Sequence, residues 1–276
     1  MTTHILELDP PAADERLAYG SHPLQFGDLR LPAGGGPHPI VVYVHGGFWR
    51  ARYDLGHAGH VCAALTAAGI ATWNIEYRRL GNGGGWPATF ADVAAAADHV
   101  RQLAARFSLD LNRLVAAGHS AGGQLALWLA ARGRIPQGSA LHTTDPIPIH
   151  AAVSIAGVCD LRLGWEMRLG SGVVRDLLDG TPDDVPDRYA AADPAERLPL
   201  GIPQILIHGT ADESVPYEVS VEYHRKAIGL GDVVELRALN GIDHFAPIDP
   251  RSEAWRETQK AIEEAVWFPS PPAPLP

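Results

Sequence analysis

The sequence predicts a doubly wound α/β fold with a mostly parallel sheet and flanking helices. Short apolar runs alternate with longer segments of helical pattern, and most of these runs show no alternation of polar and apolar residues. Strands of a parallel sheet are buried on both faces and therefore appear as continuous apolar runs. A regular succession of such strands and helices is typical of a doubly wound sheet.

The individual elements follow from these patterns. The expected strands cover residues 39–44, 70–75, 113–118, 151–156, 203–208 and 233–239. Upstream, Leu24, Phe26, Leu29 and Leu31 predict an antiparallel edge hairpin that ends at Pro32. Helices are expected over 90–107, after a capping box of Thr89 and Asp92, and over 121–132, 217–229 and 251–267.

The domain organisation is expected to be simple, with one domain over residues 1–268. Residues 158–200 interrupt the succession of strands and helices, and they predict a small lid insertion over the strand ends rather than a plain surface connection. The last residues, 269–276, are rich in proline and predict an extended tail. A chain of this length needs no disulfide or metal for its stability.

Composition excludes several classes of function. The formal net charge of −10 argues against nucleic acid as a partner, and a charged fraction of 20% argues against disorder. No stretch approaches the roughly 18 apolar residues of a membrane span, and the N-terminus has no secretory pattern, so we expect a cytoplasmic protein without membrane contact. Cys62 and Cys159 are expected to be buried free thiols, and no metal-ligand motif is present. The sequence leaves open whether the protein forms a homodimer.

The strongest chemical signal is the pentapeptide Gly118-His119-Ser120-Ala121-Gly122. It follows a predicted strand and precedes a predicted helix, which is the setting that a nucleophile elbow requires. The alternative is an ordinary glycine-rich turn between a strand and a helix. The small neighbours of Ser120 suit the tight turn of an elbow, so we predict that Ser120 is a nucleophile.

Serine needs a general base and a group that orients this base. His244 lies on a loop after the strand 233–239, and Asp212 lies in the turn after the strand 203–208. The chain order serine, aspartate, histidine matches this hydrolase architecture. The alternatives that we weighed as base were His208, His57 and His60, and as acid Glu213 and Asp243.

The tetrahedral intermediate also needs hydrogen-bond donors for its oxyanion. One predicted donor is the amide of Ala121, directly after the nucleophile. The others are the amides of Gly47 and Phe48, in the loop after the central strand, where Gly46 shapes the turn. His45 is expected to hold this loop in place.

With these residues assembled, the chain resembles the α/β-hydrolases of the esterase/lipase superfamily over about residues 20–268. The loop His45-Gly46-Gly47-Phe48-Trp49 is similar to that of the kynurenine formamidase (arylformamidase) group, since an aromatic residue stands where other esterases have a third glycine. This resemblance implies hydrolysis of N-formyl-kynurenine to kynurenine and formate, with no metal and no organic cofactor.

The favoured function is therefore a serine hydrolase that removes a small acyl group from an aromatic amide. The alternative is a carboxylesterase for short-chain acyl, acetyl or feruloyl esters. A non-catalytic binding protein of the same fold is the third class, disfavoured because the serine, the acid and the histidine are all present. Aromatic residues are expected to hold the small-molecule substrate, although each could instead pack in the core: Phe48, Trp49, Trp86, Trp165 and Phe245.

Overall fold

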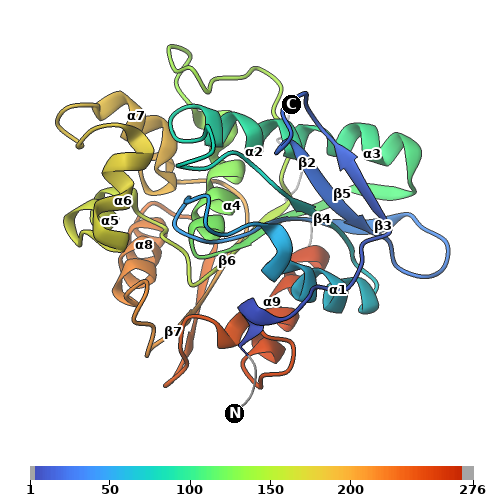
Figure 1. Cartoon of the computed structure of the whole chain (residues 1–276). Coiled ribbons are helices and arrows are strands. Elements are labelled where there is room, and N and C mark those ends of the chain that lie inside the picture. The colour runs from blue at the N-terminus through green and yellow to red at the C-terminus, as the bar shows by residue number, and fades with distance from the viewer. Residues whose placement is uncertain (1–3, 269–276) are drawn as a thin grey trace.

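An eight-stranded sheet runs through the middle of the molecule in the computed structural model, which describes residues 4–268 (Figure 1). The strand order is β1-β2-β4-β3-β5-β6-β7-β8. The strands are β1 (Glu15–Ala18), β2 (Phe26–Arg30), β3 (His38–Val44), β4 (Ala71–Ile75), β5 (Leu109–His119), β6 (Ala151–Ile155), β7 (Gln204–Gly209) and β8 (Val234–Leu239). The predicted proline-rich tail, 269–276, lies outside the described residues.

The sheet is mostly parallel, as the sequence predicted. From β4 through β3 and β5 to β8, every neighbouring pair is parallel. The two antiparallel pairs are β1 with β2 and β2 with β4, so the edge hairpin predicted upstream of Pro32 is confirmed. All six expected strands of the main sheet form within a few residues of their predicted bounds.

Nine α-helices lie within residues 4–268, and all but the last, which follows β8, stand between strands. They are α1 (Gly59–Ala67), α2 (Ala88–Asp98), α3 (Val100–Arg106), α4 (Ala121–Ala131), α5 (Leu161–Glu166), α6 (Leu169–Leu178), α7 (Pro186–Ala192), α8 (Glu218–Gly229) and α9 (Trp255–Trp267). The predicted helix over 90–107 is two successive helices, α2 and α3, which are separated at His99.

The predicted capping box of Thr89 and Asp92 is wrong. Both residues lie inside α2, which begins after Pro87 without a side-chain cap. Their side chains bind Arg78 instead: Thr89 Oγ1 donates to the Arg78 carbonyl oxygen, and the Asp92 carboxylate pairs with the guanidinium at 2.6 Å. A buried carboxylate with a charged partner nearby is better stabilised by that partner than by the helix end.

Central strand β3 shows why the strand segments of the sequence are continuously apolar. Successive side chains of a strand point to opposite faces. Ile40, Val42 and Val44 enter one buried cluster, to which α2, α4 and α8 also contribute, whereas Val41 and Tyr43 enter a second cluster with α1 and α9. Both faces of the sheet are therefore covered by helices, and the carboxyl ends of the parallel strands remain free to carry a site.

The segment 158–200, predicted as a lid, contains α5, α6 and α7 and lies to one side of the sheet (Figure 1). It is attached to α4 through buried hydrogen bonds, in which Gln124 and Trp128 donate to the carbonyl oxygens of Ala192 and Ala191. Within α6, the carbonyl oxygen of Gly170 accepts from the Arg50 guanidinium at 2.7 Å. Its action as a lid stays a prediction.

Cys62 and Cys159 are free and buried, as expected. Within residues 4–268, no helix is long and apolar enough to cross a membrane.

Candidate active site

Ser120 lies in the sharp turn between β5 and α4, the position that the sequence predicted for a nucleophile. Its backbone has φ of 57° and ψ of −121°, a conformation that non-glycine residues rarely adopt. Such backbone strain of about 1–3 kcal/mol persists only where the surroundings impose it. The geometry is that of a nucleophile elbow.

Glycines permit this turn because backbone segments approach each other closely around it. A Cβ atom on Gly122 would lie 2.0 Å from the carbonyl oxygen of Val44, and one on Gly118 would lie 2.2 Å from that of Gly122. Neither clash can be relieved by rotating a side chain, because both involve backbone atoms. We call residues 118–123 the elbow.

Asp212 and His244, predicted as acid and base, are in contact. The Nδ1 atom of His244 lies 2.6 Å from Oδ2 of Asp212. The aspartate is further fixed because its Oδ1 accepts the amides of Ser214 and Val215, each at 2.8 Å. A carboxylate at Nδ1 holds that nitrogen protonated and leaves Nε2 as the free base nitrogen.

The competing candidates have other partners or positions. Asp243 accepts the backbone amides of Phe245 and Ala246, and Glu213 is exposed. His208 is buried beside the aspartate, with Nε2 3.2 Å from Asp212 Oδ2 and 2.9 Å from the carbonyl oxygen of Val215. The geometry therefore favours Asp212 over Asp243 and Glu213 as the acid, and His244 over His208 as the base.

The environment of Asp212 stabilises its charged form. Burial by itself would raise the pKa of this carboxyl group. Hydrogen bonds from His208 and His244, the charge of His244 and the backbone amide of Val215 outweigh burial and bring the pKa below its usual range. The group is therefore an anion at neutral pH, as a partner of an imidazolium must be.

Ser120 and His244 line one cavity of about 190 Å³, which we call the Ser120 cavity. Phe245 and the oxyanion-loop residues Gly47 and Phe48 also line it. Of the other lining residues, His57 was weighed from the sequence as an alternative base and His119 belongs to the elbow motif, whereas Leu6, Tyr53 and Ser214 were not anticipated. Ser214 follows Asp212 by two residues and His119 precedes Ser120, so their positions were implicit in the motifs. Leu6 carries no such signal.

The predicted oxyanion loop lies against the elbow. A Cβ atom on Gly46 would lie 2.8 Å from the carbonyl oxygen of His119 and 3.0 Å from Cβ of Ser120. Gly47 and Phe48 both have positive φ, 115° and 52°. Within residues 4–268, no group of the protein accepts a hydrogen bond from the amides of Gly47, Phe48 and Ala121, so these amides are available for an anion.

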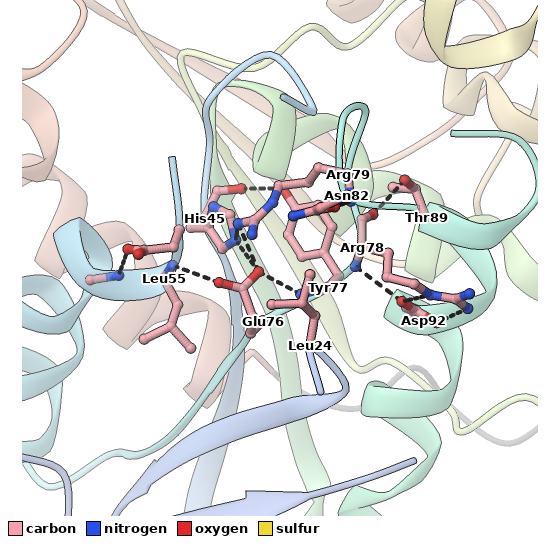
Figure 2. A network of polar contacts seen from close by, with 12 residues as sticks. Leu24, His45, Leu55, Glu76, Tyr77, Arg78, Arg79, Asn82, Thr89 and Asp92 are labelled. Carbon is pink, nitrogen blue, oxygen red and sulfur yellow. Dashed lines mark hydrogen bonds and ion pairs between the residues drawn. The ribbon is translucent and has the colours of Figure 1, made fainter. Parts of the chain in front are cut away.

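His45 anchors this loop through a buried polar network (Figure 2). Its Nδ1 atom donates to the carbonyl oxygen of Gly46 at 2.8 Å, and its own carbonyl oxygen accepts from the Tyr77 hydroxyl at 2.8 Å. On the other side of the ring, Nε2 lies 3.2 Å from Glu76 Oε1 and 3.1 Å from Arg79 Nη1. The loop-holding role expected for His45 agrees with these contacts.

Glu76 connects the members of the network. Its Oε1 atom lies 2.7 Å from Arg79 Nη1 and accepts the Tyr77 amide at 2.7 Å, and its Oε2 accepts the amide of Leu55 at 3.3 Å. Burial by itself would raise the pKa of Glu76, but His45, Arg79 and the Tyr77 amide outweigh it and lower the pKa. The carboxylate is therefore charged although it is buried.

This network has a geometric consequence for the oxyanion donors. A trans peptide unit is planar, with its C=O and N–H pointing in opposite directions. When His45 fixes the carbonyl group of Gly46, it also fixes the direction of the Gly47 N–H. The network therefore holds the Gly47 N–H, one predicted oxyanion donor, in a set orientation. Glu76 itself does not line the Ser120 cavity.

His119 supports the loop that carries His244. Its Nε2 atom donates to the carbonyl oxygen of His244 at 2.9 Å, and the two rings lie 4.5 Å apart. Burial and the neighbouring His244 lower the pKa of His119 well below its ordinary value, so the ring is neutral. From the sequence, His119 was only the variable position of the elbow motif.

Three of the predicted aromatic substrate residues do not reach the Ser120 cavity. Trp49 is fully buried in the main core, where it cannot stack on a substrate. Trp86 packs beside Phe90, and Trp165 lines a separate cavity next to α6. Phe48 and Phe245 do line the Ser120 cavity. Sequence pattern cannot separate a core tryptophan from a pocket tryptophan, because both lie in apolar surroundings.

Among the described residues, no group of three or more His, Cys, Asp or Glu side chains is placed to hold a metal ion.

Known proteins share both the sequence pattern and the fold. Residues 28–227 match the BD-FAE family. Esterase LipC of Mycobacterium tuberculosis is 31% identical over 216 residues, which are 74% of this chain and 52% of LipC, so the match spans about half of that relative.

Solved structures of esterases superpose along nearly the whole chain. The propionate-bound esterase 2 of Thermogutta terrifontis has a TM-score of 0.73 and 26% identity, over 92% of this chain and 93% of that one. A truncated carbohydrate esterase from gut microbiota has a TM-score of 0.80 at 20% identity, over 94% of this chain and 99% of that one, and shows the shared fold. The chain thus belongs to the BD-FAE family, with an α/β-hydrolase fold of the esterase type.

Proposed function

We propose that the protein is a serine carboxylesterase that cleaves esters with short acyl groups through Ser120. The observation that carries the proposal is the 2.6 Å contact between His244 Nδ1 and Asp212 Oδ2, in a cavity that Ser120 and His244 line together. Nucleophile, base and orienting acid are the three groups that acyl transfer by serine requires.

In the proposed reaction, His244 Nε2 takes the proton of Ser120 Oγ while this oxygen attacks the ester carbonyl carbon. The amides of Gly47, Phe48 and Ala121 donate to the oxyanion of the tetrahedral intermediate. The intermediate collapses, and His244 gives its proton to the departing alcohol. Water, activated by His244, then attacks the acyl-serine and releases the carboxylic acid. The Asp212 carboxylate stabilises the imidazolium in both halves of the reaction.

The size of the cavity supports a short acyl group. Its volume of about 190 Å³ is below the roughly 300–1,000 Å³ of typical small-molecule sites. Phe48 lines it and is itself backed by Gly170, where an added Cβ would lie 2.9 Å from the Phe48 ring. The Thermogutta terrifontis esterase has structures with propionate and with butyrate bound, which fits a site for small acyl groups in a protein of this fold.

Ester cleavage has more support than cleavage of an aromatic formamide. The arylformamidase prediction depends on the pentapeptide 45–49, and Trp49, which was expected to stack on the aromatic amine, is buried in the core. The relatives reported above are esterases by name. The second function predicted from the sequence, a carboxylesterase, therefore becomes the main proposal.

A substrate panel tests the proposal directly. It compares kcat/KM for p-nitrophenyl acetate, butyrate and octanoate, methyl ferulate and N-formyl-kynurenine. We expect acetate and butyrate to be cleaved at least tenfold more efficiently than octanoate and than the formamide. A preference for N-formyl-kynurenine over every ester would instead establish the formamidase, and an absence of turnover on all five would contradict both hydrolase functions.

A further inference from the structure

An N-terminal segment, residues 4–8 (dark blue in Figure 1), contributes one side chain to the wall of the Ser120 cavity. It forms a short 3-10 turn over Ile5–Glu7, in which the amide of Glu7 donates to the carbonyl oxygen of His4 at 2.9 Å. Leu6 of this turn lines the Ser120 cavity together with Ser120 and His244. No residue of this segment belongs to the predicted catalytic set.

Two contacts fix the segment on the protein. Ile5 is buried, with 2% of its surface exposed. The ring of His4 packs edge-on against Phe245 with centroids 4.8 Å apart, and Phe245 packs edge-on against His244 at 5.1 Å. The segment is thus connected to the catalytic histidine through one aromatic side chain, on the side of the cavity where His244 lies.

The segment also borders two neighbours of the Ser120 cavity. A second cavity of about 410 Å³ shares Leu6, Tyr53 and His57 with it. A third cavity of about 180 Å³ shares Phe245. His4 lines both of these neighbours, and Leu6 is the residue of the segment that lines both the Ser120 cavity and the larger neighbour.

We propose that Leu6 is a specificity-determining residue that limits the size of the alcohol group of the ester. The inference rests on the proposed esterase function. His244 must protonate the departing alcohol, so this group lies on the His244 side of Ser120. That is the side to which His4 and Phe245 attach the segment. Shortening Leu6 joins the Ser120 cavity to the larger neighbouring cavity and makes room for a bulkier alcohol.

The test uses two variants with opposite effects and a matched control. Leu6→Ala enlarges the Ser120 cavity towards its larger neighbour, and Leu6→Trp fills the Ser120 cavity. Leu8→Ala makes the same change two residues along the segment, at a half-buried side chain that does not line the Ser120 cavity. Substrates are phenyl acetate, 4-phenylphenyl acetate and phenyl hexanoate, and each ratio of kcat/KM is referred to the wild type so that intrinsic reactivity cancels.

We expect Leu6→Ala to raise the ratio for 4-phenylphenyl acetate over phenyl acetate about tenfold, the effect of one or two methylene groups in an apolar pocket. Leu6→Trp should lower this ratio, and Leu8→Ala should leave it within twofold of the wild type. The ratio for phenyl hexanoate over phenyl acetate should stay within twofold in all three variants. Matching thermal unfolding midpoints show that the variants are folded.

Two results would overturn the inference. One is an unchanged alcohol ratio in both Leu6 variants, and the other is a change in the hexanoate ratio instead, which would assign Leu6 to the acyl side. In either case phenyl acetate turnover by the wild type would leave the esterase function standing. If the wild type hydrolysed none of the three esters, the proposed function itself would fail, and the inference with it.

Discussion

The elbow and the N-terminal segment both border the Ser120 cavity, but they are held in place in different ways. At the elbow, backbone lies against backbone, and a Cβ atom on Gly122 would meet the carbonyl oxygen of Val44 at 2.0 Å. The N-terminal segment touches the rest of the site through side chains, with Ile5 buried and His4 against Phe245.

This difference separates the chemistry from the choice of substrate. Contacts between backbone atoms leave no freedom for a different side chain, so the position of Ser120 is set by the sheet and by α4. Contacts between side chains can be exchanged one at a time without moving the nucleophile. Changes at the elbow should therefore abolish function or folding, whereas changes at the segment should alter which substrate is preferred.

The largest effect is expected for Ser120→Ala. Loss of the nucleophile of such a triad lowers kcat by a factor on the order of 10⁴–10⁶. The variant should remain folded, because alanine keeps the Cβ atom of Ser120 and leaves the close backbone contacts around it unchanged. Steady-state hydrolysis of p-nitrophenyl acetate measures the loss. A folded variant that retains a tenth of the wild-type activity would show that another residue attacks the ester.

The next effect concerns the acid. Asp212→Asn should lower kcat by a factor on the order of 10⁴, because an amide does not hold His244 in the tautomer that the base requires. Glu213→Gln is the matched control, since this neighbouring side chain is exposed, and it should stay within about twofold of the wild type. A severe loss in the control with a mild loss at position 212 would reassign the acid.

Asp212 should also contribute to stability in a pH-dependent manner. Its pKa in the folded protein lies below the value of about 3.9 for an unfolded chain. The unfolded state therefore binds the proton first, and the stabilisation is present above pH 4 and lost as pH falls towards the folded pKa. The free energy of unfolding of the wild type minus that of Asp212→Asn should shrink as the pH falls below 4. A difference that grows on acidification would contradict the assigned direction of the shift.

Gly122→Ala tests the backbone contact at the elbow. The added Cβ atom has no room, so we expect a destabilisation of about 3 kcal/mol or more, which lowers the thermal midpoint by roughly 6–12 °C in a protein of this size. Gly133→Ala is the control, because no atom lies within 4 Å of its added Cβ. Equal midpoints for the two variants would mean that the elbow is less constrained than the contacts indicate.

A smaller effect is expected at the network behind the oxyanion loop. Glu76→Gln removes the charge that Arg79 and His45 share, and the Gly46–Gly47 peptide should lose its fixed orientation. We expect kcat to fall about 10- to 100-fold with little change in KM, since a misplaced donor acts mainly on the transition state. Glu15→Gln, which loses only an exposed pair with Arg106, should leave both constants unchanged.

If Glu76→Gln raised KM and left kcat unchanged, the network would serve substrate binding rather than the orientation of the oxyanion donors. The thermal midpoint of the variant shows whether a loss of activity reflects the loop or the whole fold.

The difference between the elbow and the N-terminal segment also explains which parts of the site the sequence could predict. The strands of the sheet and the residues Ser120, Asp212 and His244 follow local rules, in which a buried run predicts a strand and the turn after it carries the functional residue. Leu6 lies more than 100 residues from Ser120 and has no motif, so only the folded chain shows that it borders the site. Trp49 was misassigned because an apolar side chain next to a glycine-rich loop can turn either to the core or to the cavity.

The central claim is that Ser120 is the nucleophile of an ester hydrolase. Mass spectrometry of the intact protein after treatment with a serine-directed fluorophosphonate tests it most directly, followed by mapping of the labelled peptide. We predict one adduct per chain, located on Ser120, and none on Ser120→Ala under the same conditions. An adduct on another serine, equal labelling of Ser120→Ala, or no adduct on the folded wild type would contradict the claim.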